Sequence, residues 1–202
     1  MKEDLIQQFR KYTAATIYEA AGKLGGMEPH IRSIVPGSRM AGPAFTVKCL
    51  VGDARAVAQA VDRAKAGDVL VIDAGATDLT TPWGSMSATA AQLKGLAGCV
   101  TNAGVRDVDE LLEIGFPVFA AGVGIGGNVK LHPGWMGLPV SIGGVTVQPG
   151  DFVIGDSDGV VVVPARRAGE ICARAAEQQA KEDEIMRRIR TGEPLARIFG
   201  ID

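Results

Sequence analysis

The chain has 202 residues, of which 47% are hydrophobic, so it can build one domain with a sizeable core, whereas two domains would be cramped. Its 21 Lys and Arg against 23 Asp and Glu give a net charge of -2, which disfavours nucleic acid and an anionic membrane surface as partners. No apolar run approaches the roughly 18 residues of a membrane span, and the N-terminus is not a signal sequence. The three scattered cysteines fit neither a disulfide framework nor a zinc site. We predict a single cytoplasmic domain over residues 1–202, with reduced thiols and a small or metal-bound ligand.

Helix and strand patterns alternate along the chain before strands take over. Helical spacing ended by "GKLGG" predicts a helix near residues 3–25, and residues 129–164 are typical of strands and turns. Between them the pattern predicts short strands at 31–50, a helix at 53–66, a strand at 68–75, a helix at 85–94, a strand at 96–104, a helix at 107–114 and a strand at 116–127. Strands covered first by helices and then by further strands predict an α/β fold with three β/β/α layers.

The chain closes with one long charged helix at about 165–191. Its apolar stripe is thin, with Ile171, Ala175, Ile185 and Ile189 as its members. Packing on its own domain is the default interpretation, but so thin a stripe also suits packing on a neighbouring subunit.

Several familiar motifs are absent or lack their context. The run "GVGIGG" follows a strand, but "NVKLHPGWMG" cannot open the helix that a dinucleotide or S-adenosylmethionine site needs. His30 and His132 belong to no zinc-hydrolase spacing, and no serine lies in G-x-S-x-G. Asp156 and Asp158 fit a turn before a buried valine strand, so we expect them to be structural.

Two loops remain as the candidate site, "WGSMSA" before one helix and "GVRD" after the next strand. A single α-β unit separates them, so both should lie at the same edge of a parallel sheet and face each other. The helix N-terminus at Ser85, Met86 and Ser87 suits a carboxylate, and Arg106 adds a planar fork for oxygens.

Asp107 allows two interpretations. With Glu110 three residues later it fits a capping box that opens "DVDELLEI". It could instead hold a hard divalent cation, with water filling most of the coordination shell.

The sequence from "GDVLVIDAG" through "WGSMSA" and "GVRD" to "GDSDGVVVVP" resembles the class II 4-hydroxy-4-methyl-2-oxoglutarate aldolases, whose fold is shared by the RraA-type regulators of ribonuclease E. The resemblance covers most of the chain, and the Gly84-to-Arg106 spacing with Asp107 is its most specific element. It implies an RraA-like swivelling β/β/α fold in homotrimers or hexamers.

The resemblance also implies the roles of the site residues. The pyruvyl part of the substrate would be bound by Gly84, Ser85, Met86 and Ser87. Arg106 would bind a substrate oxygen, and Asp107 would bind Mg2+ or Mn2+. Many of these aldolases have an acidic residue where this chain has Ser85. They also use a glutamate from the neighbouring subunit's C-terminal helix, for which Glu182 is the match and Glu184 the fallback.

These roles imply a metal-dependent pyruvate lyase. The substrate would be a 4-hydroxy-2-oxo acid of the 4-hydroxy-4-methyl-2-oxoglutarate or 4-carboxy-4-hydroxy-2-oxoadipate type, with oxaloacetate decarboxylation as a side activity through the same pyruvate enolate. The metal would act as a Lewis acid while Arg106 stabilises the enolate oxygen. No residue is marked as the general base, and a metal-bound water is the default.

Two other classes of protein compete with this interpretation. The first is a non-catalytic regulator of ribonuclease E, against which the long C-terminal helix argues. The second is a quinone methyltransferase, against which the context of "GVGIGG" argues.

Overall fold

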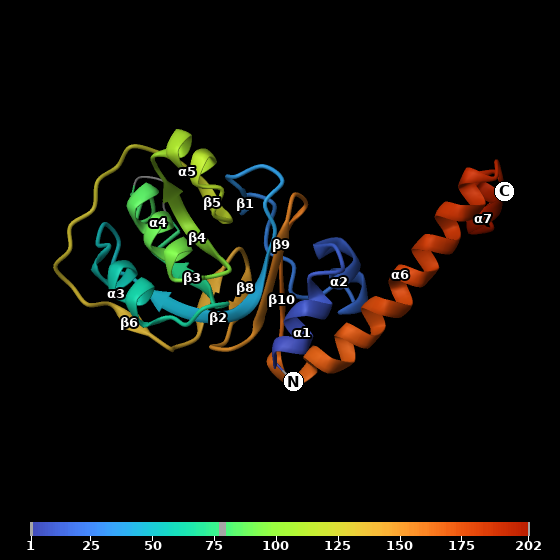
Figure 1. Ribbon diagram of the computed structural model, residues 1–202, viewed down its shortest axis with the longest axis horizontal. Coiled ribbons are helices and arrows are strands. Elements are labelled where there is room, and N and C mark those ends of the chain that lie inside the picture. Colours follow the sequence, from blue (N-terminus) through green and yellow to red (C-terminus); the bar gives the residue numbers. More distant parts are fainter. Residues whose placement is uncertain (1, 77–79, 202) are drawn as a thin grey trace.

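A mixed sheet with helices on both sides forms the body of the protein, as shown by the computed structural model, which describes residues 2–76 and 80–201 (Figure 1). The helices are α1 (Lys2–Phe9), α2 (Ala14–Ala20), α3 (Arg55–Arg63), α4 (Ser85–Leu93), α5 (Val108–Ile114), α6 (Ala168–Arg190), α7 (Leu195–Phe199) and the 3-10 turn η1 (Ala165–Arg167). The strands are β1 (Arg32–Ser33), β2 (Met40–Lys48), β3 (Val69–Asp73), β4 (Gly98–Val105), β5 (Val118–Val123), β6 (Trp135–Met136), β7 (Val140–Ile142), β8 (Val145–Val147), β9 (Phe152–Asp156) and β10 (Gly159–Val163).

The sheet order is β1-β5-β4-β3-β2-β9-β10, with β6 added to β2. Strands β2 to β5 run parallel, whereas β9 and β10 are antiparallel, and β1 lies against β10, so the sheet is nearly a closed barrel. The predicted three-layer β/β/α fold is confirmed.

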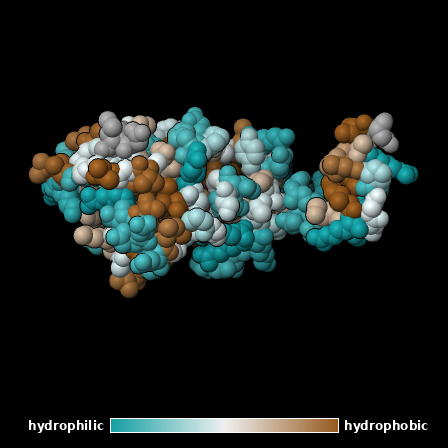
Figure 2. Space-filling model, turned by 90° about the horizontal axis from the view of Figure 1, so that it is seen from above, coloured by the Kyte–Doolittle hydropathy of each residue, from teal (hydrophilic) through white to brown (hydrophobic). Residues whose placement is uncertain are grey.

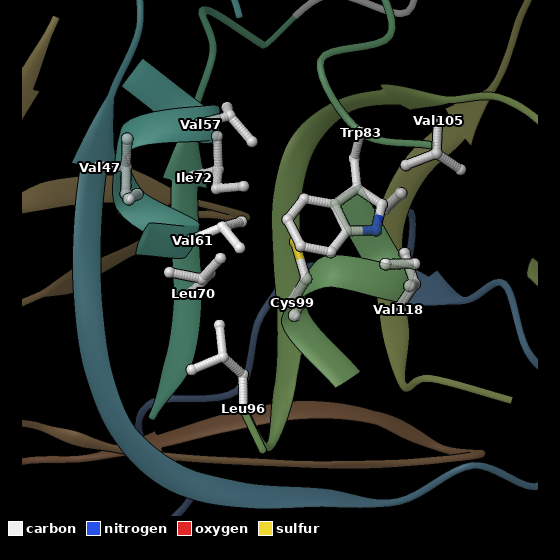
Figure 3. Close-up of a cluster of buried hydrophobic side chains, with 14 of the residues drawn as sticks. Val47, Val57, Val61, Leu70, Ile72, Trp83, Leu96, Cys99, Val105 and Val118 are labelled. Atoms are coloured by element: carbon white, nitrogen blue, oxygen red, sulfur yellow. The ribbon is translucent and has the colours of Figure 1, made fainter. Parts of the chain in front are cut away.

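Three apolar clusters hold the layers together. The first lies between the parallel strands and helices α3 to α5, and Figure 3 shows part of it around Trp83. The second joins β9 and β10 to α1, α2 and α6, and the third lies under the hairpin β7-β8. Strands β3 and β4 are buried along their whole length, as expected for parallel strands covered on both faces.

The predicted helix near 3–25 is wrong as one unit, because Thr13 begins a second helix. Its backbone is extended and its hydroxyl accepts a hydrogen bond from the Thr16 amide at 3.1 Å, so α2 starts afresh after α1. The C-terminal helix is confirmed as α6, with η1 in place of its first turn.

Asp156 has the structural role expected of it. Its carboxylate accepts hydrogen bonds from the amides of Ala14, at 2.7 Å, and Asp158, at 3.1 Å, and thereby ties the β9-β10 turn to the start of α2. All three cysteines are buried as free thiols. Burial raises the pKa of Cys49 to about 12, so this thiol stays protonated at neutral pH.

Within the described ranges, none of the helices combines the length and the apolar character needed to cross a bilayer. The run Gly122–Gly127 leads into an irregular segment rather than a helix, as the sequence predicted.

Candidate active site

The two candidate loops meet at the carboxyl edge of the parallel strands. Strand β4 ends at Val105, and the residue before the Gly84 loop, Trp83, forms a parallel bridge with it. The Arg106 amide donates a hydrogen bond to the Trp83 carbonyl oxygen at 3.1 Å. The loop that leads into α4 is therefore fastened along the end of β4, and the predicted juxtaposition is present.

Trp83 anchors this loop in the core. The side chain is 1% exposed and its ring stacks on Phe116 with the centroids 5.9 Å apart. In Figure 3 it lies among Val105, Val118 and Cys99. A large buried aromatic residue at this position fixes the backbone of the residues that follow it.

Of the two interpretations of Asp107, the capping box is absent. Its backbone is left-handed, with φ at 59°, and its side chain makes no capping hydrogen bond to α5. The carboxylate instead crosses to the neighbouring helix, where Oδ2 accepts hydrogen bonds from the Ser85 amide at 3.0 Å and the Ser85 hydroxyl at 3.1 Å. Asp107 therefore joins the start of α4 to the start of α5.

Gly84 makes this contact possible. A Cβ atom at position 84 would lie 2.5 Å from Asp107 Oδ2 and 3.3 Å from Arg106 Cγ. The φ of Gly84 is -163°, an extended value open to any residue, so the need for glycine here is one of space.

The Arg106 side chain lies beside Asp107 without a close ion pair. Its Nε is 3.8 Å from Asp107 Oδ1, and the side chains of Arg106 and Asp107 are 46% and 33% exposed. The guanidinium retains N–H donors for a planar ligand, and Oδ1 retains its lone pairs.

A cavity of about 240 Å³ opens at this point. Its lining includes Gly84, Met86, Ser87, Arg106 and Asp107, which are five of the predicted site residues. The volume is below the roughly 300–1,000 Å³ typical of pockets for drug-sized ligands, so the cavity suits a small acid.

Ser85 is not among the residues that line the cavity. Its amide and hydroxyl both serve Asp107, so the first-turn amides left for an anion are those of Met86 and Ser87.

Sequence reasoning missed two further residues of the cavity wall. Asn128 and Lys130 line it from the irregular segment between β5 and β6. Asn128 Oδ1 is buried with no hydrogen-bond partner among the described residues, and Lys130 is exposed. Nothing local in the sequence marks them, because the segment has neither helical nor strand periodicity.

A buried polar network supports the same sheet edge. Asp73, at the end of β3, is 6% exposed and accepts hydrogen bonds from Lys48 Nζ at 2.6 Å and Asn102 Nδ2 at 2.8 Å. Burial alone would raise the pKa of Asp73, but these hydrogen bonds outweigh it and lower the pKa below its usual value.

Glu182 and Glu184 lie on α6, away from this cavity within the same chain. Glu182 Oε2 accepts a hydrogen bond from the Thr16 hydroxyl at 3.2 Å, and Oε1 accepts one from Gln178 at 2.9 Å. Glu184 pairs with Arg187 at 2.7 Å.

The far end of α6 leaves the body of the protein. We call residues 176–201, which follow Ala175, the last buried residue of α6, the arm. Figure 1 shows it projecting from the sheet, and Figure 2 shows apolar residues gathered at its tip. Exposed apolar side chains on the arm are Met186, Ile189, Leu195, Phe199 and Ile201.

The cavity offers oxygen ligands for a hard cation but not a complete coordination shell. Among the described residues there is no group of three or more His, Cys, Asp or Glu side chains that could hold a metal. Asp107 Oδ1 and the unpartnered Asn128 Oδ1 are oxygen atoms of the kind that Mg2+ and Mn2+ prefer. One carboxylate with several waters is an ordinary arrangement for Mg2+, so the residues fit such an ion.

A second cavity of about 460 Å³ lies between α2 and the β9-β10 turn. It contains the acidic side chains of Glu28 and Asp158, and no Lys, Arg or His lines it. It therefore does not suit an anionic substrate.

Comparison with known proteins assigns the chain to a family. The model of the RraA-like family, described as Aldolase/RraA, matches residues 14–162. A protein of Halalkalibacterium halodurans provisionally named a 4-hydroxy-4-methyl-2-oxoglutarate aldolase is 33% identical over 186 residues, which are 92% of this chain and 89% of that protein.

Solved structures agree with the family match. An uncharacterized protein from Pseudomonas syringae pv. tomato superposes with a TM-score of 0.88 at 30% identity, covering 98% of this chain and 93% of that one. The RNA-processing inhibitor RraA from Thermus thermophilis superposes with a TM-score of 0.69 at 28% identity, covering 75% of this chain and 92% of that one.

Proposed function

The chain belongs to the RraA-like family, and from this membership and the cavity at Arg106 we propose that it is a divalent-metal-dependent lyase. The reaction is cleavage of a 4-hydroxy-2-oxo acid to pyruvate and a second oxo compound, with oxaloacetate decarboxylation as a side activity. The observation that carries the proposal is the convergence of the Gly84 loop, Arg106 and Asp107 on one small cavity.

The chain's own residues supply the binding of the pyruvyl group. The first-turn amides of Met86 and Ser87 and the dipole of α4 favour the substrate carboxylate. The guanidinium of Arg106 binds the keto oxygen and stabilises the negative charge that develops there as the C–C bond breaks. Since that charge exists only in the transition state and the enolate, the interaction lowers the barrier.

Asp107 would hold the cation, Mg2+ or Mn2+, through Oδ1. When bound, the cation supplies Lewis acidity to the keto group. The two Ser85 hydrogen bonds to Oδ2 keep the carboxylate in place for this role.

Lys130 suits the distal end of the substrate. It adds a second cation to the cavity lining, where a second carboxylate of a dicarboxylic 4-hydroxy-2-oxo acid would gain a partner. This favours 4-hydroxy-4-methyl-2-oxoglutarate or 4-carboxy-4-hydroxy-2-oxoadipate over a neutral distal group.

The arm would complete the site of a neighbouring subunit in a homotrimer or hexamer. Its exposed apolar residues have no cover within the described part of the chain, and Met86 and Leu131 near the cavity are 82% and 74% exposed. Two different apolar surfaces on one chain favour a head-to-tail contact that closes into a ring. Glu182, or Glu184 in its place, would then act in the neighbour's site.

A panel assay tests the proposal. Purified protein is given 4-hydroxy-2-oxo acids and oxaloacetate with Mg2+ or Mn2+, and pyruvate is followed with lactate dehydrogenase. We expect release that stops in excess chelator and returns with added metal. Release that persists undiminished in chelator would refute the metal requirement, and no release from any substrate would refute the lyase.

A non-catalytic regulator of RNA processing is the second candidate. The similarity to the RraA structure favours it, as does Asp107 being the one acidic side chain among the described residues that line the cavity. Absence of pyruvate release together with inhibition of ribonuclease E would establish it.

A further inference from the structure

The segment between β5 and β6 forms one wall of the cavity although it has almost no secondary structure. We call residues 124–134 the strap, and Figure 1 shows this stretch looping around the outside of the molecule on its way to β6. It contributes Gly127, Asn128 and Lys130 to the cavity. Because the strap has almost no hydrogen-bonded secondary structure of its own, contacts with other segments must fix its position relative to the Gly84 loop.

The strap begins at the edge of the site, where the Gly124 amide donates to the Val105 carbonyl at 2.9 Å and the Thr81 hydroxyl donates to the Gly126 carbonyl. Its middle part is bonded instead to the residues before α3. The Val129 amide donates to the Gly52 carbonyl and the Ala54 amide donates to the Val129 carbonyl, each at 2.9 Å. Val129 thereby forms a parallel bridge with Asp53. Side chains alternate along an extended segment, so Asn128 and Lys130 point to the side opposite Val129, toward the cavity.

Asp53 is the centre of this attachment. Its side chain is 6% exposed, and Oδ2 accepts hydrogen bonds from the amides of Leu131 at 2.9 Å and His132 at 2.7 Å. Oδ1 accepts one from the Arg55 amide at 2.9 Å. The His132 and Arg55 amides hold the pKa of Asp53 below its usual value, so the carboxylate is charged at neutral pH.

We propose that Asp53 is a positioning residue for the cavity: it fixes the strap, and through the strap it holds Asn128 and Lys130 as the wall that receives the distal part of the ligand. Asp53 is not among the residues that line the cavity, so it acts through its neighbours. The unpartnered Asn128 Oδ1 then accepts a hydrogen bond from the bound ligand. The part of this inference that concerns catalysis rests on the proposed function.

Only a carboxylate can accept all the hydrogen bonds offered at position 53. Three N–H donors point at its two oxygens, and an amide would present its own NH2 group to at least one of them. Asp53→Asn therefore keeps the size of the side chain and loosens the strap.

Asp151 provides a matched control. It is 7% exposed, and its carboxylate likewise accepts backbone hydrogen bonds, from the amides of Gln148 and Ala165, each at 2.9 Å. It contacts neither the strap nor the cavity lining. Asp151→Asn should thus match the general cost of replacing a buried, hydrogen-bonded carboxylate, while the strap keeps its position.

The experiment compares the two variants by hydrogen exchange, by calorimetric titration with 2-oxoglutarate and Mg2+, and by kinetics. In Asp53→Asn we expect the hydrogen-bonded amides of Val129, Leu131 and His132 to exchange on the order of tenfold faster. We also expect weaker binding of 2-oxoglutarate, which has a distal carboxylate to pair with Lys130, and a fall in kcat/KM of about ten- to a hundredfold, mainly through KM, because a displacement of about 1 Å can cost on the order of a hundredfold. Asp151→Asn should keep wild-type values in all three measurements.

Wild-type exchange across 128–132 in Asp53→Asn, or changes no larger than those of Asp151→Asn, would overturn the proposal. A wild-type protein that releases no pyruvate would refute the proposed function instead, and exchange, which needs no substrate, would still decide whether Asp53 fixes the strap.

Discussion

Replacing Gly84 with alanine adds one methyl group at the most crowded point of the site. The new Cβ would lie 2.5 Å from Asp107 Oδ2, so the carboxylate must retreat by roughly 1 Å to restore an ordinary contact. The hydrogen bonds from the Ser85 amide and hydroxyl, now 3.0 and 3.1 Å long, would then exceed hydrogen-bonding distance. The extended backbone at position 84 adds no strain, so the displacement of Asp107 is the main consequence.

The expected magnitudes separate folding from function. Crowding of this kind costs about 1–3 kcal/mol of stability, which a domain of this size can tolerate. Pyruvate release should fall by about a hundredfold, since about 1 Å of misplacement at a catalytic group has that effect. Gly169→Ala is the control, because a Cβ there meets no atom within 4 Å and the position lies on α6, far from the cavity lining.

Kinetics with circular dichroism measure both effects. A folded Gly84→Ala variant with wild-type turnover and wild-type metal dependence would refute the reasoning, because it would show that the Asp107–Ser85 contact has no part in activity.

Four further outcomes follow from the geometry. Arg106→Lys should lose much of kcat while the melting temperature is unchanged, because lysine keeps the charge but not the planar fork; near-wild-type rates would mean that Arg106 is only a solvated charge. Asp107→Asn should lose metal-dependent pyruvate release while staying folded, since an amide is a poor ligand for a hard cation; an unchanged metal titration would contradict that role. Glu182→Gln should impair turnover without dissociating the oligomer in analytical ultracentrifugation, and a fully active monomer would exclude the arm from catalysis. The lowered pKa of Asp73 means that its contribution to stability is complete above about pH 4 and is lost as the pH falls through the folded-state pKa. The difference in unfolding free energy between wild type and Lys48→Met should therefore be constant near neutral pH and shrink below about pH 4, whereas a difference independent of pH would contradict the Lys48 contact.

The layers and the meeting of the two loops could be predicted because they follow from local order. Buried strands alternate with helices from Val69 to Val123, and parallel strands joined by helices place successive loops at one edge. The break at Thr13 escaped prediction because apolar residues continue at helical spacing across it. A single hydroxyl that caps α2 leaves little trace in that pattern.

The capping-box interpretation of Asp107 fails for a different reason. The spacing to Glu110 satisfies the local rule for a capping box, but the left-handed backbone at Asp107 turns its carboxylate toward Ser85, 22 residues earlier in the chain. The strap was missed for the same reason, since Asp53 and Leu131 are 78 residues apart. Contacts of this range depend on how β3, β4 and α3 pack, which no local pattern reports.

Ser85 lets Asp107 join α4 to α5 through one carboxylate oxygen while the other oxygen stays available for a cation. The Ser85 amide and hydroxyl both donate to Oδ2, which leaves Oδ1 with only the 3.8 Å approach of Arg106 Nε. An acidic residue at position 85 could offer the amide but not the hydroxyl, and it would place a second negative charge beside Asp107. Serine therefore orients the carboxylate and leaves one oxygen open toward the cavity. Having serine in place of an acid removes one potential ligand for the cation. The serine hydroxyl, however, gives the Asp107 carboxylate a second hydrogen bond that holds it in place.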